Sequence, residues 1–374
     1  MKIFYANDTS SEAHVGCKAV SNAHFRLLAA AGATLCGIAS VSEGKDLLTA
    51  DPEKSVENLI DSTWGALIEE SDAVVVNGEG TIHHGRGRLP LAFLAAGQKL
   101  GKETYLVNAL VDGVSAYKDI FPNLTAVSVR DPESKAVVRK LGATRIYLRR
   151  DSFFEADFVD EPTCSLRGEI VVGDAHPEVL SSVEALEDFG KDTSRWMLED
   201  PQRVYDWQHA LANLQGAEVY VTGRYHGVCL AALAGVPFVP VRSNSRKIES
   251  LLHWSGCDIP ICANAEEIAR QVEVVDSKRP EYERFFEFVK RSSGRTHLDA
   301  IFGEHLSLKM SDANKGLSPL ARAVRSQNQV HELIRNSVAQ TNIAAAKREC
   351  FMRSKIDMYL KRINYLKKKY SEDL

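Results

Sequence analysis

The feature that most constrains the fold is a regular alternation of short apolar segments with longer segments of helical spacing. The apolar segments, which we interpret as strands, span residues 2–6, 34–39, 73–77, 104–108 and 126–129. The segments of helical spacing between them span residues 15–31, 56–70, 91–100 and 132–141. The strand at 73–77 is almost wholly apolar, as in a strand buried on both faces. Strands separated by helices predict parallel βαβ units and a doubly wound sheet.

The alternation stops at residues 149–168, where we predict a linker, and then resumes. Further strands are predicted at 169–172, 218–222 and 237–241, with helices at 201–214, 226–234, 266–272 and 281–290. We therefore predict an α/β protein with two doubly wound Rossmann-like domains facing a cleft, which is the GT-B-like plan. The predicted domains are 1–150 and 168–300, followed by a basic helical tail at 311–374. Ligands of such sheets bind beyond the carboxyl ends of the strands.

Charge is divided unevenly along the chain. Residues 315–374 carry 13 basic and 5 acidic side chains, a net charge of +8, so residues 1–314 carry −12. Because duplex nucleic acid requires a basic face, we expect no nucleic-acid partner for this acidic body. No apolar run reaches the roughly 18 residues that span a bilayer, and the N-terminus resembles a first strand more than a secretory signal. The seven scattered cysteines favour a reducing compartment over a disulfide framework.

The tail has an apolar stripe of helical spacing. Its members recur three or four positions apart: Met352, Ile356, Tyr359, Ile363, Leu366 and Tyr370. Isolated helices of this length are marginal, so we expect the tail to dock on its own body, on a sister subunit or on an anionic membrane face. The two tyrosines favour the packing options, because a lipid-facing helix more often has Phe, Trp or Leu at such positions.

A glycine-rich turn follows the buried strand at 73–77. Its notable residues are Gly78, Glu79, Gly80, Thr81, His83 and His84. Glycines let the backbone approach a ligand, and the start of the next helix offers N–H groups to an anion. A plain tight turn explains the glycines, but it does not explain a carboxylate and two imidazoles within six residues. No HExxH-type spacing accompanies them, so we predict no metal site.

Two arginines come directly after predicted strands. Arg130 is followed by Asp131-Pro132, which suits a helix N-cap, so capping with an Arg–carboxylate bridge explains it as well as anion binding does. Arg224 and His226 precede a small-residue helix, where they can face a cleft and serve an anionic ligand and a proton transfer. Lys247 adds charge near the same edge, although a solvated loop also explains it.

Three elements in this order resemble the polysaccharide pyruvyl transferase family over roughly residues 1–255: Asn-Gly-Glu-Gly at 77–80, Ser-Val-Arg-Asp-Pro-Glu-Ser at 128–134 and Val-Thr-Gly-Arg-Tyr-His-Gly at 221–227. Members of this family transfer the enolpyruvyl carbons of phosphoenolpyruvate to a sugar as a ketal, with a GT-B-like fold and no essential metal. The resemblance implies that Arg130, Arg224 and His226 hold and activate phosphoenolpyruvate.

We extend this assignment to neighbouring residues. We expect the acceptor on the side of domain 1–150 and the donor on the side of domain 168–300. The predicted donor-binding set is Arg130, Ser134, His176, Arg224, His226, Gly227 and Lys247. The predicted acceptor-binding set is Gly78, Gly80, Thr81, His83 and His84. His226, Glu79 and Arg224 are the predicted catalytic residues. The sequence departs from the family in two places on the acceptor side. His14-Val15-Gly16-Cys17 stands where the family has Asn-x-Gly-Asp, and Glu79 lies within the family's three-glycine turn.

Two rival interpretations stay open. His176-Pro177 follows the first strand of the second domain and resembles the His-Pro element with which sialyl- and Kdo-transferases hold a CMP-sugar. In that case the protein is a glycosyltransferase, Glu79 or another cleft carboxylate is its acid/base or nucleophile, and Arg224 and His226 serve the donor. The second rival is a catalytically degenerate assembly protein, against which the retained Arg224 and His226 argue.

We expect a transferase that acts on a cell-surface glycan, such as a capsule or lipopolysaccharide, or on its precursor. Phosphoenolpyruvate is expected as a co-substrate, without a cofactor. The expected location is the cytoplasm, peripheral to the inner face of the membrane if the basic tail contacts lipid, and a homo-oligomer is expected if the tail packs on a sister chain.

Overall fold

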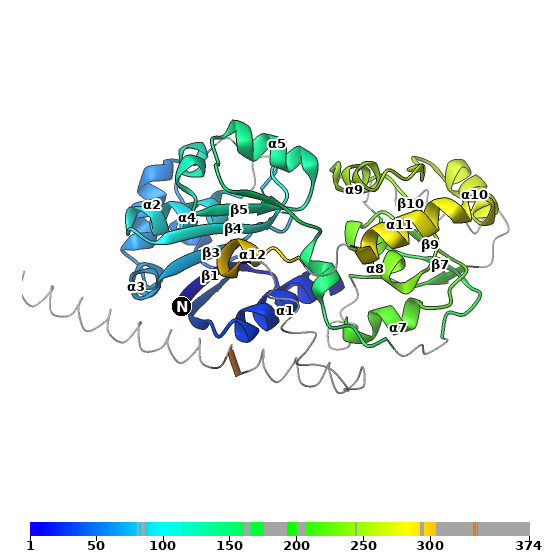
Figure 1. The fold of residues 1–374 in the computed structure, drawn as a ribbon, viewed down its shortest axis with the longest axis horizontal. Coiled ribbons are helices and arrows are strands. Elements are labelled where there is room, and N and C mark those ends of the chain that lie inside the picture. Colours follow the sequence, from blue (N-terminus) through cyan, green and yellow to red (C-terminus); the bar gives the residue numbers. More distant parts are fainter. Residues whose placement is uncertain are drawn as a thin grey trace, which may run out of the picture.

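The protein consists of two α/β units side by side, in the computed structural model of Figure 1. The structure describes residues 1–80, 82–83, 87–114, 116–160, 165–175, 193–199, 207–243, 245–291, 295–303, 332–333 and 335. Nearly all of the predicted tail, and His176-Pro177, lie outside these residues. No helix within them is both long and apolar enough to cross a membrane.

The first unit is built on a six-stranded sheet with the order β2-β1-β3-β4-β5-β6, and every neighbouring pair is parallel. Its strands are β1 (Lys2–Asp8), β2 (Thr34–Ser40), β3 (Ala73–Asn77), β4 (Glu103–Ala109), β5 (Ala126–Val129) and β6 (Ile146–Leu148). Its helices are α1 (Val15–Ala30), α2 (Pro52–Ile60), α3 (Thr63–Glu70), α4 (Arg88–Lys99) and α5 (Pro132–Lys140), with short 3-10 turns η1 (Lys45–Leu47), η2 (Lys118–Asn123) and η3 (Ser152–Glu155). All five residues of β3 are buried, as its apolar sequence predicts.

The second unit has a smaller parallel sheet with the order β10-β9-β7-β8. Its strands are β7 (Ile170–Val172), β8 (Thr193–Arg195), β9 (Val219–Thr222) and β10 (Phe238–Pro240). Its helices are α7 (Ala210–Leu214), α8 (Tyr225–Ala234), α9 (Lys247–Ser255), α10 (Ala265–Val274) and α11 (Arg279–Arg291), with 3-10 turns η6 (Trp207–His209) and η7 (Asp276–Lys278). Two parallel α/β units confirm the predicted fold class.

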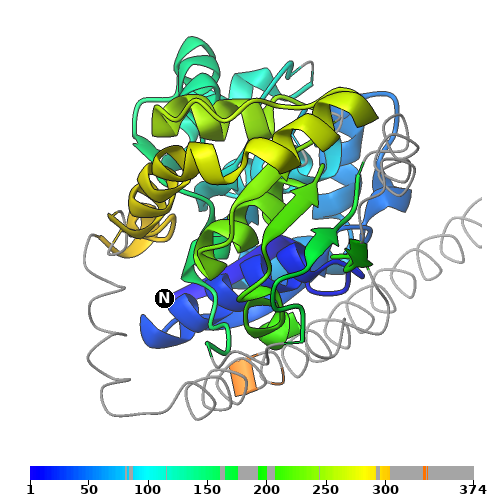
Figure 2. The same ribbon diagram turned by 90° about the vertical axis from the view of Figure 1, so that its right-hand side faces the viewer.

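Segments from each unit pack on the other. Val15, Ala19 and Val20 of α1 belong to the hydrophobic core of the second unit. Figure 2 shows the blue α1 crossing among the green elements of that unit. After α11 the chain returns, and α12 (Asp299–Phe302) lies against the first sheet (Figure 1), where Leu298 and Ala300 join its core. The sequence pattern grouped residues up to 300 with the second unit.

Local sequence explains where helices begin. Asp131 is the N-cap of α5, since its carboxylate accepts the amide proton of Ser134 at 2.7 Å and Pro132 takes the first helical position. The single helix predicted at 56–70 is instead two, α2 and α3. Ser62 starts the second by accepting from the Trp64 amide, and a Cβ on Gly65 would lie 1.8 Å from the Ile60 carbonyl oxygen. That joint therefore requires glycine.

Candidate active site

A cavity of about 550 Å³ opens where the carboxyl ends of strands from both sheets face each other. It is lined by Glu12, Ala13, His14, Cys17, Glu79, Gly80, His83, Arg130, Glu199, Arg224, Tyr225, His226 and Lys247. Glu79 comes just after β3, Arg130 just after β5 and Arg224 just after β9. The cavity thus brings together residues from the three sequence motifs at 77–80, 128–134 and 221–227.

Arg130 is a buried cation with a fixed orientation. Its side chain is 3% exposed, and Nη1 donates to Oδ2 of Asp151 at 2.5 Å. Its guanidinium carbon lies 4.5 Å from the centre of the Tyr225 ring. Burial alone would lower the pKa of Arg130, but Asp151 holds it above its ordinary value. Burial would likewise raise the pKa of Asp151, and Arg130 holds it well below the usual range. Both groups therefore stay charged.

His226, the second residue of α8, has a closely packed ring. Phe153 stacks on it with centroids 5.1 Å apart and an interplanar angle of 17°. Gly16 lies so close that an added Cβ would be 2.0 Å from His226 Nδ1. His226 Nε2 lies 3.8 Å from Oε1 of Glu79 and 3.6 Å from Oδ1 of Asp151. One nitrogen of the imidazole thus faces two carboxylates.

Glu79 is the buried carboxyl group of the cavity. Oε2 accepts from the Thr9 hydroxyl at 2.8 Å, and its backbone amide donates to Asn77 Oδ1 at 3.2 Å. Burial raises the pKa of Glu79, and the neighbouring His226 opposes this rise. A carboxyl group with a raised pKa, placed beside an imidazole, is suited to proton transfer.

Two further cations face the cavity. Arg224 is 30% exposed and pairs with Glu199 at 2.5 Å. Lys247 is the first residue of α9, and burial, with help from Arg130 and Arg224, lowers its pKa to about 8. Together with Arg130, they give the cavity three basic side chains close to the N-termini of α8 and α9. This arrangement suits an anion that carries more than one negative charge.

Some predicted site residues have other places in the structure. Ser134 is fully buried, donates to Asp131 Oδ2 at 2.6 Å and is not among the cavity-lining residues. Gly227 packs on Thr222, and Gly78 packs on Ala109, so closely that a Cβ would lie 2.3 and 2.5 Å from them, respectively. Gly80 and His83 do line the cavity. Thr81, His84 and His176 lie outside the described residues, so their predicted roles stay predictions.

Several residues of the site were not predicted from the sequence. His14 is the N-cap of α1, where Nδ1 accepts the Gly16 amide proton at 3.0 Å, and burial lowers its pKa well below 6.5. His14 and Cys17 line the cavity at the departure from the family pattern, which was the available clue. Asp151 and Phe153 lie in the segment interpreted as a linker, and no sequence pattern marked them.

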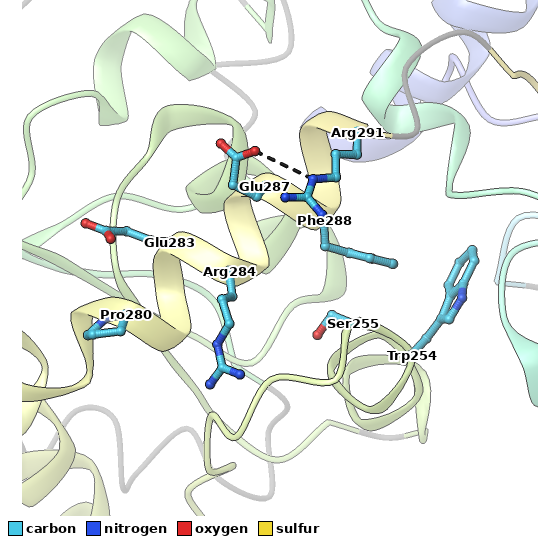
Figure 3. Close-up of a pocket in the computed structure, with 8 residues that line it drawn as sticks. All are labelled: Trp254, Ser255, Pro280, Glu283, Arg284, Glu287, Phe288 and Arg291. Carbon is cyan, nitrogen blue, oxygen red and sulfur yellow. Dashed lines mark ion pairs between the residues drawn. The ribbon is translucent and has the colours of Figure 1, made fainter.

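A second hollow, of about 780 Å³, lies between α9 and α11 (Figure 3). Figure 3 shows Trp254 and Phe288 beside each other there, and Glu287 paired with Arg291. It contains none of the predicted residues and no buried acid or histidine. The smaller cavity is therefore the better candidate for chemistry. No group of three His, Cys, Asp or Glu side chains suited to a metal ion occurs in the part of the chain that the structure describes.

Comparisons with known proteins agree with this geometry. The family model described as polysaccharide pyruvyl transferase matches residues 11–245, which is more than half of the chain and includes all three elements. The chain belongs to the polysaccharide pyruvyl transferase family. That membership supports a transferase that modifies glycans. No curated protein matches the sequence.

Solved structures show the same architecture at low sequence identity. A Listeria monocytogenes protein assigned as a UDP-N-acetylglucosamine 2-epimerase has a TM-score of 0.52 and 12% identity, covering 84% of this chain and 95% of that one. UDP-GlcNAc 2-epimerase from Methanocaldococcus jannaschii, in complex with UDP-GlcNAc and UDP, has a TM-score of 0.50 and 15% identity, covering 78% and 100%. These likenesses show the GT-B-like fold.

Proposed function

We propose that this protein transfers the pyruvyl group of phosphoenolpyruvate to a sugar of a cell-surface glycan, such as a capsule or lipopolysaccharide, or of its precursor. The observation that supports this most is the combination in one cavity of three basic side chains with a buried Glu79–His226 pair. Phosphoenolpyruvate has a carboxylate and a phosphate that need cationic partners, and an enol carbon that must be protonated. Family membership supports the same donor.

In the proposed reaction, Arg130, Arg224 and Lys247 hold the carboxylate and the phosphate. His226 or Glu79 gives a proton to the methylene carbon, which becomes a methyl group while C2 gains oxocarbenium character. One sugar hydroxyl adds to C2, a second hydroxyl replaces the phosphate, and the two hydroxyl protons leave with the base and the phosphate. The products are a cyclic ketal and inorganic phosphate. The basic side chains stabilise the charge that develops at the phosphate.

We place the acceptor sugar on the side of the first unit, near Gly80 and His83. No cofactor is part of the proposal. The five cysteines among the described residues are free, which is consistent with a reducing compartment and with the cytoplasmic location that we propose. Contact with a membrane or a sister chain through the basic tail stays a prediction.

Donor binding tests the proposal. The purified protein is heated with phosphoenolpyruvate, with CMP and with UDP, and its melting temperature is recorded. A millimolar ligand with micromolar affinity stabilises the folded state by about 4 kcal/mol, so phosphoenolpyruvate should raise the melting temperature clearly. Protection by CMP, and none by phosphoenolpyruvate, would refute the proposal and favour the glycosyltransferase alternative. Loss of that protection in His176→Ala would then identify the His-Pro element as its site.

A further inference from the structure

The turn between the two units, at Asp151 and Phe153, joins functional groups that belong to different sheets. Arg130 follows β5 of the first sheet, and His226 begins the helix that follows β9 of the second. Asp151 Oδ2 accepts from Arg130 Nη1 at 2.5 Å, and Oδ1 lies 3.6 Å from His226 Nε2. Phe153, two residues on, is stacked on the His226 ring. The turn therefore contacts both groups at once.

The turn itself is anchored firmly. The backbone amide of Phe153 donates to Asp151 Oδ1 at 2.8 Å, which fixes the carboxylate. The amide of Ser152 donates to Asn108 Oδ1 at the end of β4, and its hydroxyl bonds His24 of α1 at 2.7 Å. Asp151 and Phe153 are both fully buried, and neither lines the cavity. They are thus placed to act through their neighbours without touching a ligand themselves.

We propose that Asp151 and Phe153 are positioning residues that hold Arg130 and His226 in one arrangement across the two units. The proposal rests on the proposed function for its catalytic meaning. It extends that function, because it makes the predicted linker part of the transfer machinery. A displacement of about 1 Å in a reacting group can cost about 100-fold in rate, so loosening either contact should be costly.

Asp151 also acts on Glu79 through charge. Burial is the main cause of the raised pKa of Glu79, and the negative charge of Asp151 adds to the rise while His226 and Arg130 oppose it. Among the described residues, Tyr5, Thr9, Cys17 and Lys247 also interact with Glu79. When Asp151 becomes neutral, the pKa of Glu79 should therefore fall. A purely structural role for Asp151 predicts no such change.

The test compares Asp151→Asn with a matched control, Asp157→Asn. Asp157 lies in the same segment and forms a largely buried ion pair with Arg26 at 3.4 Å, but it does not line the cavity. Both variants should lower the melting temperature. Only Asp151→Asn should lower kcat/KM for phosphoenolpyruvate, by about 100-fold. Equal losses of kcat/KM in the two variants would overturn the proposal.

A second measurement does not depend on activity. The Glu79 carboxyl is followed by ¹³C NMR during a pH titration, with Glu79→Gln to assign the resonance. In Asp151→Asn its midpoint should move to lower pH, and in Asp157→Asn it should not; an unmoved midpoint in Asp151→Asn refutes the proposal. If the unaltered protein does not turn over phosphoenolpyruvate, the proposed function fails. The titration still decides whether Asp151 acts on Glu79.

If Asp151→Asn does not fold, Phe153→Leu provides a second test. This variant keeps an apolar side chain and the ion pair of Arg130 with Asp151, but it removes the ring that stacks on His226. Its kcat should fall at least tenfold, with KM for phosphoenolpyruvate nearly unchanged, because Arg130 is not disturbed. An unchanged kcat in this variant would contradict the positioning role of Phe153.

Discussion

Gly16→Ala should separate catalysis from folding, because the missing side chain of Gly16 makes room for His226. An added Cβ would lie 2.0, 2.3 and 2.6 Å from Nδ1, Cγ and Cβ of the His226 side chain. The ring cannot move away freely, since Phe153 is stacked on it. We therefore expect either a displaced imidazole or a displaced N-terminus of α1.

The magnitudes follow from these distances. Overpacking of this kind costs about 1–3 kcal/mol, while replacing glycine by alanine in a helix returns up to about 1 kcal/mol. The net loss of folding free energy is then about 0–3 kcal/mol, a fall of at most several degrees in melting temperature. A shift of about 1 Å in His226 should lower kcat by about 100-fold, so activity falls far more than stability.

Steady-state kinetics with phosphoenolpyruvate and a thermal melt on the same preparation provide the assay. Gly97→Ala is the control, because a Cβ there would lie 2.7 Å from Val74 Cγ2, in the core between α4 and the first sheet. It should lower the melting temperature and leave kcat of the folded protein unchanged. A Gly16→Ala enzyme with normal kcat would refute the idea that the Gly16 contact holds the imidazole in place.

Three further predictions concern Arg224, Lys247 and the basic tail. Arg224→Lys keeps the charge but loses the bidentate fork, so the Kd for phosphoenolpyruvate measured by calorimetry should rise at least tenfold. The control is Arg246→Lys, because Arg246 has nearly the same exposure (29% against 30%) and does not line the cavity; this variant should leave the Kd unchanged. Lys247 is charged below its pKa of about 8 and neutral above it, so affinity for inorganic phosphate should fall as pH rises through 8, and Lys247→Gln should abolish that dependence. The last prediction concerns deletion of the chain after residue 308. The deletion should lower the melting temperature if the tail docks within the chain, and lower the solution mass if the tail docks on a sister chain. If the tail docks on a membrane, the deletion should remove salt-sensitive binding to anionic vesicles; no change in any of these three measurements would contradict the docking prediction.

The sequence predicted the sheet architecture well because burial on both faces leaves a plain apolar pattern. The strand at 73–77 was predicted with the bounds of β3, and so was the strand at 126–129. Short strands at the edges were missed: β6 and β8 have three residues each, and β8 contains no apolar residue. Three residues cannot display a period of two, and an edge strand need not be apolar.

The candidate site was predictable where a functional side chain directly follows a strand. Glu79, Arg130 and Arg224 were found in this way, because parallel strands bring their carboxyl ends together without any further assumption. The sequence alone did not distinguish an anion-binding role of Arg130 from a simple capping arrangement. In the structure, two different residues perform the capping and the long-range pairing. Asp131 caps α5, whereas Arg130 pairs with Asp151, 21 positions later in the chain.

That long-range pair explains why the contacts of Asp151 were not predicted from the segment at 149–168. A linker and a positioning turn have the same local sequence requirement, which is a loss of periodicity, because neither forms a long helix or strand. What distinguishes them is burial, and the burial of Asp151 is created by α1 and α8, which are distant in sequence. In the sequence, Asp151 directly follows two arginines, Arg149 and Arg150, a pattern typical of a solvated cluster of charges. It is instead the buried partner of a third arginine, Arg130, and this makes the turn between the units a component of the site that both units share.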